Sequence, residues 1–118
     1  MPLSKKTCIA CKKDTPALSR ERAVELCKEI PGWGMEDEAK CLIRSFRFKN
    51  FAEALEFVCA VAVIAEQEKH HPDITFGWGY ATILLSTHSI KGLHENDFIM
   101  AAKISGLVEN AVSKPRQP

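Results

Sequence analysis

The segment 54–65 constrains the fold of this chain more than any other, because it is apolar on nearly every side of the helix predicted there. Asn50, with Glu53 three residues later, has the form of a capping box, so this helix is predicted to run from residue 50 to about residue 69. The chain has 118 residues, enough for one domain but too few to cover the whole circumference of such a helix. We therefore expect other subunits to cover the remainder, with a central core helix inside one domain as the alternative.

The remaining sequence predicts elements in the order αββαββα. Ser19 suits a helix N-cap, and Pro31-Gly32 stops the helix that follows it. Two extended segments precede the apolar helix, and two more follow Pro72 with a hairpin turn at residues 77–79. The extended segments are 33–35, 41–48, 73–76 and 80–87, and the last helix is 95–112. Two hairpins that each follow a helix favour an α+β domain, in which an antiparallel sheet carries its helices on one face.

The predicted domain covers residues 19–112 and lies between two irregular ends. Residues 1–18 are rich in Lys and lack periodicity, so we expect a flexible N-terminal arm. Residues 113–118 contain two prolines and cannot continue a helix, so this C-terminal tail is expected to fray.

The charge balance is close to neutral, with 16 Lys and Arg against 15 Asp and Glu and a formal net charge of +1. This balance argues against nucleic acid or an acidic membrane as the partner, because both require a basic excess. The longest apolar run, 57–65, is about half of the ~20 residues that span a bilayer. No apolar leader precedes it, and the five cysteines form an odd count, so we expect reduced thiols and a cytoplasmic location.

Two adjacent histidines, His70 and His71, are the first candidates for chemistry. Pro72 disfavours helical geometry in the residue before it, so both histidines are predicted to lie at a helix-to-strand junction and to flank one pocket. Glu66 precedes His70 by one helical turn and is expected to contact it. Two exposed histidines on a polar loop are the alternative.

A third histidine, His88, ends the predicted strand 80–87 and therefore lies at another element end, where sites are commonly built. Imidazoles exchange protons near neutral pH. The chain has no nucleophile motif and no glycine-rich phosphate loop, so general acid–base chemistry is what these residues support. His94 is predicted to be a cap or surface residue, and Asp97 either orients an imidazole or serves the first helical turn.

Cys8 and Cys11 form a Cys-x-x-Cys pair in the N-terminal arm. Such a pair supplies half of a zinc site, but no second pair and no His-x3–5-His spacing completes it. We expect thiols without a function there, with a metal site confined to the arm as the alternative, and no metal in the domain itself.

The spacing of the candidate residues resembles the signature of the pterin-4a-carbinolamine dehydratases, also called 4a-hydroxytetrahydrobiopterin dehydratases. The matching residues are Glu66, His70, His71, Pro72, Trp78, His88 and Asp97. The likeness covers about residues 19–112. It implies a four-stranded antiparallel sheet with three helices on one face, a pterin substrate, no cofactor, and a homodimer or homotetramer formed through residues 50–69.

The resemblance also implies the reaction. The family removes water from 4a-hydroxytetrahydropterin to give quinonoid dihydropterin, which recycles the cofactor of aromatic amino-acid hydroxylases and suggests a functional link to phenylalanine hydroxylase. Some animal relatives also bind a homeodomain transcription factor. A non-enzymatic oligomeric interaction protein, similar to a transcriptional coactivator, is therefore the alternative function.

Carried over to this chain, the resemblance gives the three histidines the catalytic roles. We expect His71 and His88 to transfer protons, and His70 and Glu66 to position the substrate. The other assigned roles are pterin-edge binding by the backbone of Ser86 and Thr87, support from Asp97 behind the histidines, and core packing by Trp78. The positions that depart from the family pattern are Lys69, Ile74 and Asn96.

Overall fold

The computed structural model describes residues 2–10, 15–36 and 38–112, with side chains as far as Val108. Within these residues, three α-helices and four strands follow one another in the predicted order αββαββα. The helices are α1 (Arg20–Cys27), α2 (Phe51–Glu68) and α3 (Glu95–Val112); the strands are β1 (Gly34–Glu36), β2 (Cys41–Arg47), β3 (Asp73–Gly77) and β4 (Tyr80–Leu85). Two short 3-10 helices, Leu3–Lys5 and His88–Ile90, complete the elements.

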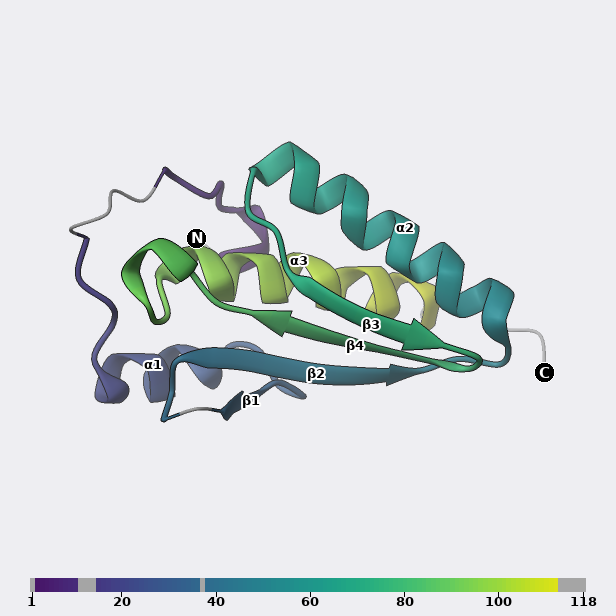
Figure 1. The fold of residues 1–118 in the computed structure, drawn as a ribbon, viewed down its shortest axis with the longest axis horizontal. Helices are drawn as coiled ribbons and strands as arrows, with labels where there is room; N and C mark the ends of the chain where they lie inside the picture. The colour runs from purple at the N-terminus through teal and green to yellow at the C-terminus, as the bar shows by residue number, and fades with distance from the viewer. Residues whose placement is uncertain (1, 11–14, 37, 113–118) are drawn as a thin grey trace.

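The described strands form one antiparallel sheet in the order β1-β2-β4-β3, which confirms the predicted α+β class. In β4 the residues Ala81, Ile83 and Leu85 are buried, whereas those between them are only half-buried. Because alternate residues of a strand point to opposite faces, one face of the sheet carries the core. Residues of all three helices join that core, and Figure 1 shows α1 and α3 behind the strands with α2 beside β3.

Helix α2 is covered on one side only within the single chain. Ala54, Phe57, Val61 and Ala65 are buried. Other positions of the helix expose large apolar side chains, namely Phe51, which also contacts the ring of Phe76, and Leu55 and Val63. We call these three residues the open face of α2. None of the described helices is long and apolar enough to cross a membrane.

The N-terminal segment contacts the domain, although the sequence predicts a free arm over residues 1–18. Leu3 is 4% exposed and joins the core, and the Lys103 ammonium donates to the carbonyl of Ser4 over 3.0 Å. One buried leucine and a few backbone contacts leave no periodic pattern in the sequence, so hydrophobic periodicity could not reveal this packing. The prediction of fraying at 113–118 falls outside the described residues.

Candidate active site

The end of α2 brings the two adjacent histidines to the edge of the sheet. Lys69 caps the helix in a left-handed conformation (φ 55°, ψ 40°), and its N–H donates to the carbonyl of Ala65. The N–H of His70 donates to the same carbonyl over 3.2 Å. The helix therefore ends at Glu68, and His70 and His71 lie in the connection to β3, as the position of Pro72 predicted.

His70 is held by a buried carboxylate. Its Nε2 lies 2.7 Å from Oδ1 of Asp97, and the two side chains are 12% and 0% exposed. The second carboxylate oxygen accepts from the Thr87 hydroxyl over 2.7 Å and from the N–H of His94 over 3.0 Å. Because a carboxylate only accepts hydrogen bonds, Nε2 of His70 carries the hydrogen, and in the neutral ring Nδ1 is the acceptor atom.

Glu66 contacts His71 and not His70, which corrects the expectation from helical spacing. Oε2 of Glu66 lies 2.6 Å from Nε2 of His71, and both side chains are exposed. The reason is the left-handed cap at Lys69, which takes the chain out of the helix before His70. Spacing rules for a helix face do not apply beyond that residue.

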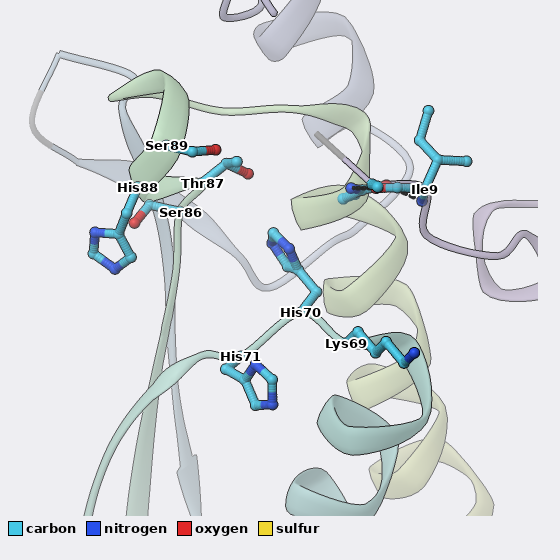
Figure 2. A pocket seen from close by; sticks show the side chains of 10 residues that line it. Ile9, Lys69, His70, His71, Ser86, Thr87, His88 and Ser89 are labelled. Atoms are coloured by element: carbon cyan, nitrogen blue, oxygen red, sulfur yellow. Dashed lines mark hydrogen bonds between the residues drawn. The ribbon is translucent and has the colours of Figure 1, made fainter. Parts of the chain in front are cut away.

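A hollow of about 300 Å³ brings most of the predicted site residues together, and we call it the histidine pocket. Small-molecule sites commonly measure about 300–1,000 Å³. Five of its lining residues were predicted from the sequence as site residues, namely His70, His71, Ser86, Thr87 and His88. The other five are Ile9, Ala10, Lys69, Ser89 and Asn96. In Figure 2, His70 and His71 come from the α2–β3 connection, and His88 lies on the other side with Ser86 and Thr87.

His88 lies at the start of the short 3-10 helix that follows β4. Thr87 forms a bridge with Gly92, so the strand ends earlier than predicted and His88 begins the next turn. The His88 side chain is exposed, and it also lines a second hollow of about 330 Å³. Within the described residues its imidazole makes no hydrogen bond, in contrast to His70 and His71.

Trp78 lies away from the histidine pocket, and its predicted role in core packing is wrong. It is 72% exposed, at the turn between β3 and β4. Gly77 pairs directly with Tyr80, which leaves Trp78 and Gly79 as a two-residue turn at the hairpin tip. A side chain at such a tip has no opposite layer to pack against.

The described residues contain no group of three His, Cys, Asp or Glu side chains that could hold a metal ion. Cys8 is half-buried and its thiol donates to the carbonyl of Asn96 over 3.7 Å. Burial, together with the nearby carboxylate of Glu68, raises the pKa of this thiol to about 12, so it stays protonated at ordinary pH. Cys11, the other half of the Cys-x-x-Cys pair, lies outside the described residues.

Sequence reasoning missed Ile9 and Ala10 as pocket residues. Both belong to a segment without periodicity, and their position depends on contacts of the backbone with Asn96. The one signal in the sequence was that Asn96 departs from the family pattern.

Comparison with known proteins gives a consistent result. A family model described as "Pterin 4 alpha carbinolamine dehydratase" matches residues 16–107. A protein of Cupriavidus pinatubonensis named "Putative pterin-4-alpha-carbinolamine dehydratase 1" is 53% identical over 105 residues, which are 89% of this chain and 90% of that protein. A relative from Methylococcus capsulatus with the same name, apart from the numeral, is 49% identical over 109 residues, 92% of this chain and 96% of its own.

Two solved structures share the fold. A transcriptional coactivator/pterin dehydratase from Brucella melitensis superposes with a TM-score of 0.73 and 32% identity, covering 77% of this chain and 97% of that one. A pterin dehydratase-like protein described as a RuBisCO assembly factor in the alpha-carboxysome gives a TM-score of 0.56 and 27% identity, over 64% of this chain and 88% of its own. The range matched by the family model includes His70, His88 and Asp97 but excludes Ile9 and Ala10.

Proposed function

Because the chain belongs to the pterin-4a-carbinolamine dehydratase family, we propose that it removes water from a 4a-hydroxytetrahydropterin and releases the quinonoid dihydropterin. The observation that carries this proposal is the histidine pocket, which brings three imidazoles around one hollow and fixes one of them to a buried carboxylate. The hydroxypterin would be the product of an aromatic amino-acid hydroxylase such as phenylalanine hydroxylase.

The reaction needs one acid and one base. The bond between C4a and the hydroxyl oxygen breaks, and the departing hydroxyl takes up a proton and leaves as water. N5 of the ring loses its proton, and the electron pair of that N–H bond forms the C4a–N5 double bond. Two imidazoles in complementary protonation states satisfy both requirements without a cofactor.

We assign the base to His70, which differs from the pair expected from the sequence. Asp97 holds the hydrogen on Nε2, so Nδ1 of His70 is free to accept the N5 proton. The carboxylate would also stabilise the imidazolium that forms, as the aspartate does in a Ser-His-Asp triad. A base of fixed tautomer and orientation saves the reorganisation that an exposed ring requires.

We assign the acid to His88, on the opposite side of the pocket (Figure 2). Its exposed ring exchanges protons with water, which reloads it after each turnover. His71, paired with Glu66 at the pocket rim, would bind substrate and not transfer the proton.

The pyrimidine edge of the pterin would meet Ser86. The backbone N–H and carbonyl of Thr87 are bonded to Gly92, and its hydroxyl donates to Asp97. Thr87 therefore supports the carboxylate, and the edge-binding role that the sequence divided between the two residues falls to Ser86.

We also propose that the active form is a homodimer or homotetramer that covers the open face of α2. Phe51, Leu55 and Val63 expose large apolar side chains on that helix. Burial of such a face against other copies of the chain is the arrangement that stabilises it best in water.

The test is the rate at which purified protein accelerates the loss of 4a-hydroxytetrahydropterin, generated in situ by an aromatic amino-acid hydroxylase. The wild type is expected to accelerate it, and His70→Ala and His88→Ala are expected to lose most of that rate. The matched control is His94→Asn, since residue 94 lies outside the pocket lining and Asn retains a helix-capping side chain. A wild type that gives only the background rate contradicts the proposal.

A further inference from the structure

Two residues of the N-terminal segment, Ile9 and Ala10, lie at the histidine pocket, although they are far in the sequence from its other lining residues. Ile9 and Ala10 line the hollow together with His70 and Asn96. In Figure 2, Ile9 lies on one side of His70, and Ser86 and His88 lie on the other. The segment therefore forms a wall at the end of the pocket opposite to β4.

Asn96 fixes this wall. Its Oδ1 accepts from the N–H of Ile9 over 3.0 Å, and its Nδ2 donates to the carbonyl of Ile9 over 2.6 Å. Asn96 is 2% exposed, so its amide is held in place by the surrounding residues, whereas Ile9 is largely exposed. Asn96 precedes Asp97 on α3, and one helical turn thus positions both the wall and His70.

Further contacts attach the same segment to two helices. The N–H of Cys8 donates to Oε1 of Glu68 over 2.8 Å, at the end of α2. Lys6 pairs with Glu95 over 2.6 Å, at the start of α3. Residues 6–9 are therefore attached to both α2 and α3 in the absence of substrate.

Resting on the proposed function, we propose that Ile9 and Ala10 bind the substituent on C6 of the pterin and that Asn96 positions them. With the pyrimidine edge at Ser86 and N5 at His70, the C6 substituent extends past His70 toward Ile9 and Ala10. Neither Ile9 nor Ala10 carries a group that transfers protons. The wall therefore sets affinity and substrate choice, and it leaves the chemical step unchanged.

The experiment compares two substrates, the 4a-hydroxy forms of tetrahydrobiopterin and of 6-methyltetrahydropterin, which differ in the C6 substituent. For Asn96→Ala we expect KM for the biopterin form to rise about fivefold to twentyfold, the equivalent of one or two hydrogen bonds. KM for the 6-methyl form and both kcat values should change less than about twofold, as for a group that does not enter the transition state. An equal rise in both KM values, a fall in kcat alone, or no change overturns the inference.

Two further variants keep this test decisive. Ala10→Phe adds bulk at an exposed residue, so the fold is retained, and it should discriminate against the biopterin form in the same way. Ser105→Ala removes a buried hydrogen-bonding side chain from α3 whose partners are Trp33 and Arg44, and it should change neither KM. A change with Ser105→Ala equal to that with Asn96→Ala shows a general loss of packing and overturns the inference.

A readout without turnover separates this inference from the proposed function. If the wild type shows no dehydratase activity, the proposed function is wrong. Binding of the C6 substituent by Ile9 and Ala10 is then tested by the affinity for 7,8-dihydrobiopterin, measured by fluorescence. A weaker affinity in Asn96→Ala supports the wall, and an unchanged affinity overturns it. In the wild type the Cys8 thiol contacts the backbone carbonyl of Asn96. If the Asn96 side chain holds residues 8–10 in place, alkylation of Cys8 by iodoacetamide should be faster in Asn96→Ala. An unchanged rate shows that Asn96 does not hold the segment.

Discussion

Nε2 of His70 lies 2.7 Å from Oδ1 of Asp97, whose side chain is completely buried. The same carboxylate binds the hydroxyl of Thr87, just beyond the end of β4. One side chain of α3 thus joins the α2–β3 connection to the end of the sheet. The orientation of His70 is therefore set by the packing of three elements and does not depend on the substrate.

The first prediction concerns Asp97→Asn. The amide can no longer accept from both His70 and Thr87, and it favours the wrong tautomer of the imidazole. We expect kcat to fall by about 100-fold or more, by analogy with loss of the orienting aspartate in a catalytic triad. Steady-state kinetics with a pH profile measures this, since a purely structural role would leave the profile of the remaining activity unchanged.

Two matched variants are compared with Asp97→Asn for their loss of kcat. Thr87→Val removes one hydrogen bond to Asp97 and keeps the side-chain shape, so a loss of about fivefold is expected. Glu66→Gln removes the carboxylate from the exposed pair with His71, and exposed pairs are weak, so less than about threefold is expected. A loss with Glu66→Gln as large as that with Asp97→Asn contradicts the assignment of the base to His70.

The order of the elements was readable from the sequence because local signals determine it. The side chain of Ser19 accepts from the N–H of Arg22, and Oδ1 of Asn50 accepts from the N–H of Glu53, so both predicted N-caps are confirmed. Caps, breakers and the period of apolar residues act over a few residues. They therefore locate helices and strands without knowledge of the tertiary structure.

The hydrogen-bond partners of the site residues could not be predicted from the sequence, because they depend on the backbone conformation at the ends of the elements. Because Lys69 has a left-handed conformation, Glu66 contacts His71 and not His70, and His70 contacts Asp97. The two-residue turn after Gly77 exposes Trp78. The first outcome follows from a dihedral angle that a non-glycine residue type does not specify, and the second depends on which two residues occupy the tip of the predicted hairpin.

The second prediction concerns the thiol of Cys8, whose pKa is raised by burial from 9.0 to about 12. Between these values the unfolded chain loses the proton and the folded chain keeps it. The resulting stabilisation is complete below pH 9 and decreases as the pH rises toward 12. Urea unfolding at pH 8 and pH 10 should therefore show a larger loss of stability for the wild type than for Cys8→Ala, and parallel losses contradict the assignment.

The third prediction concerns the open face of α2. Val63→Glu introduces a charge into the proposed contact between subunits, so the molar mass measured by light scattering should fall to that of a smaller species. Val24→Glu is the matched control, because Val24 is also exposed but lies on α1, and its oligomeric state should equal that of the wild type. If the wild type is monomeric at all concentrations, the proposed homodimer or homotetramer is wrong.

The fourth prediction concerns Ala39, which has a left-handed backbone (φ 65°) between β1 and β2. Ala39→Gly should stabilise the protein by about 0.5–1 kcal/mol, because glycine adopts this conformation without a steric cost. The same substitution at Ala62, an exposed position in α2, should destabilise it by about 1 kcal/mol. Urea unfolding of both variants at one protein concentration measures these changes. A loss of stability with Ala39→Gly contradicts a left-handed backbone at residue 39.

The most direct test of the account is chemical rescue of His70→Ala on 4a-hydroxytetrahydropterin. If Nδ1 of His70 accepts the N5 proton, the variant should lose most of the wild-type kcat. Added imidazole should restore part of that rate in proportion to its concentration and leave the wild type unaffected. Full activity of His70→Ala without imidazole, or a lost rate that imidazole does not restore, contradicts the role of His70 as the catalytic base.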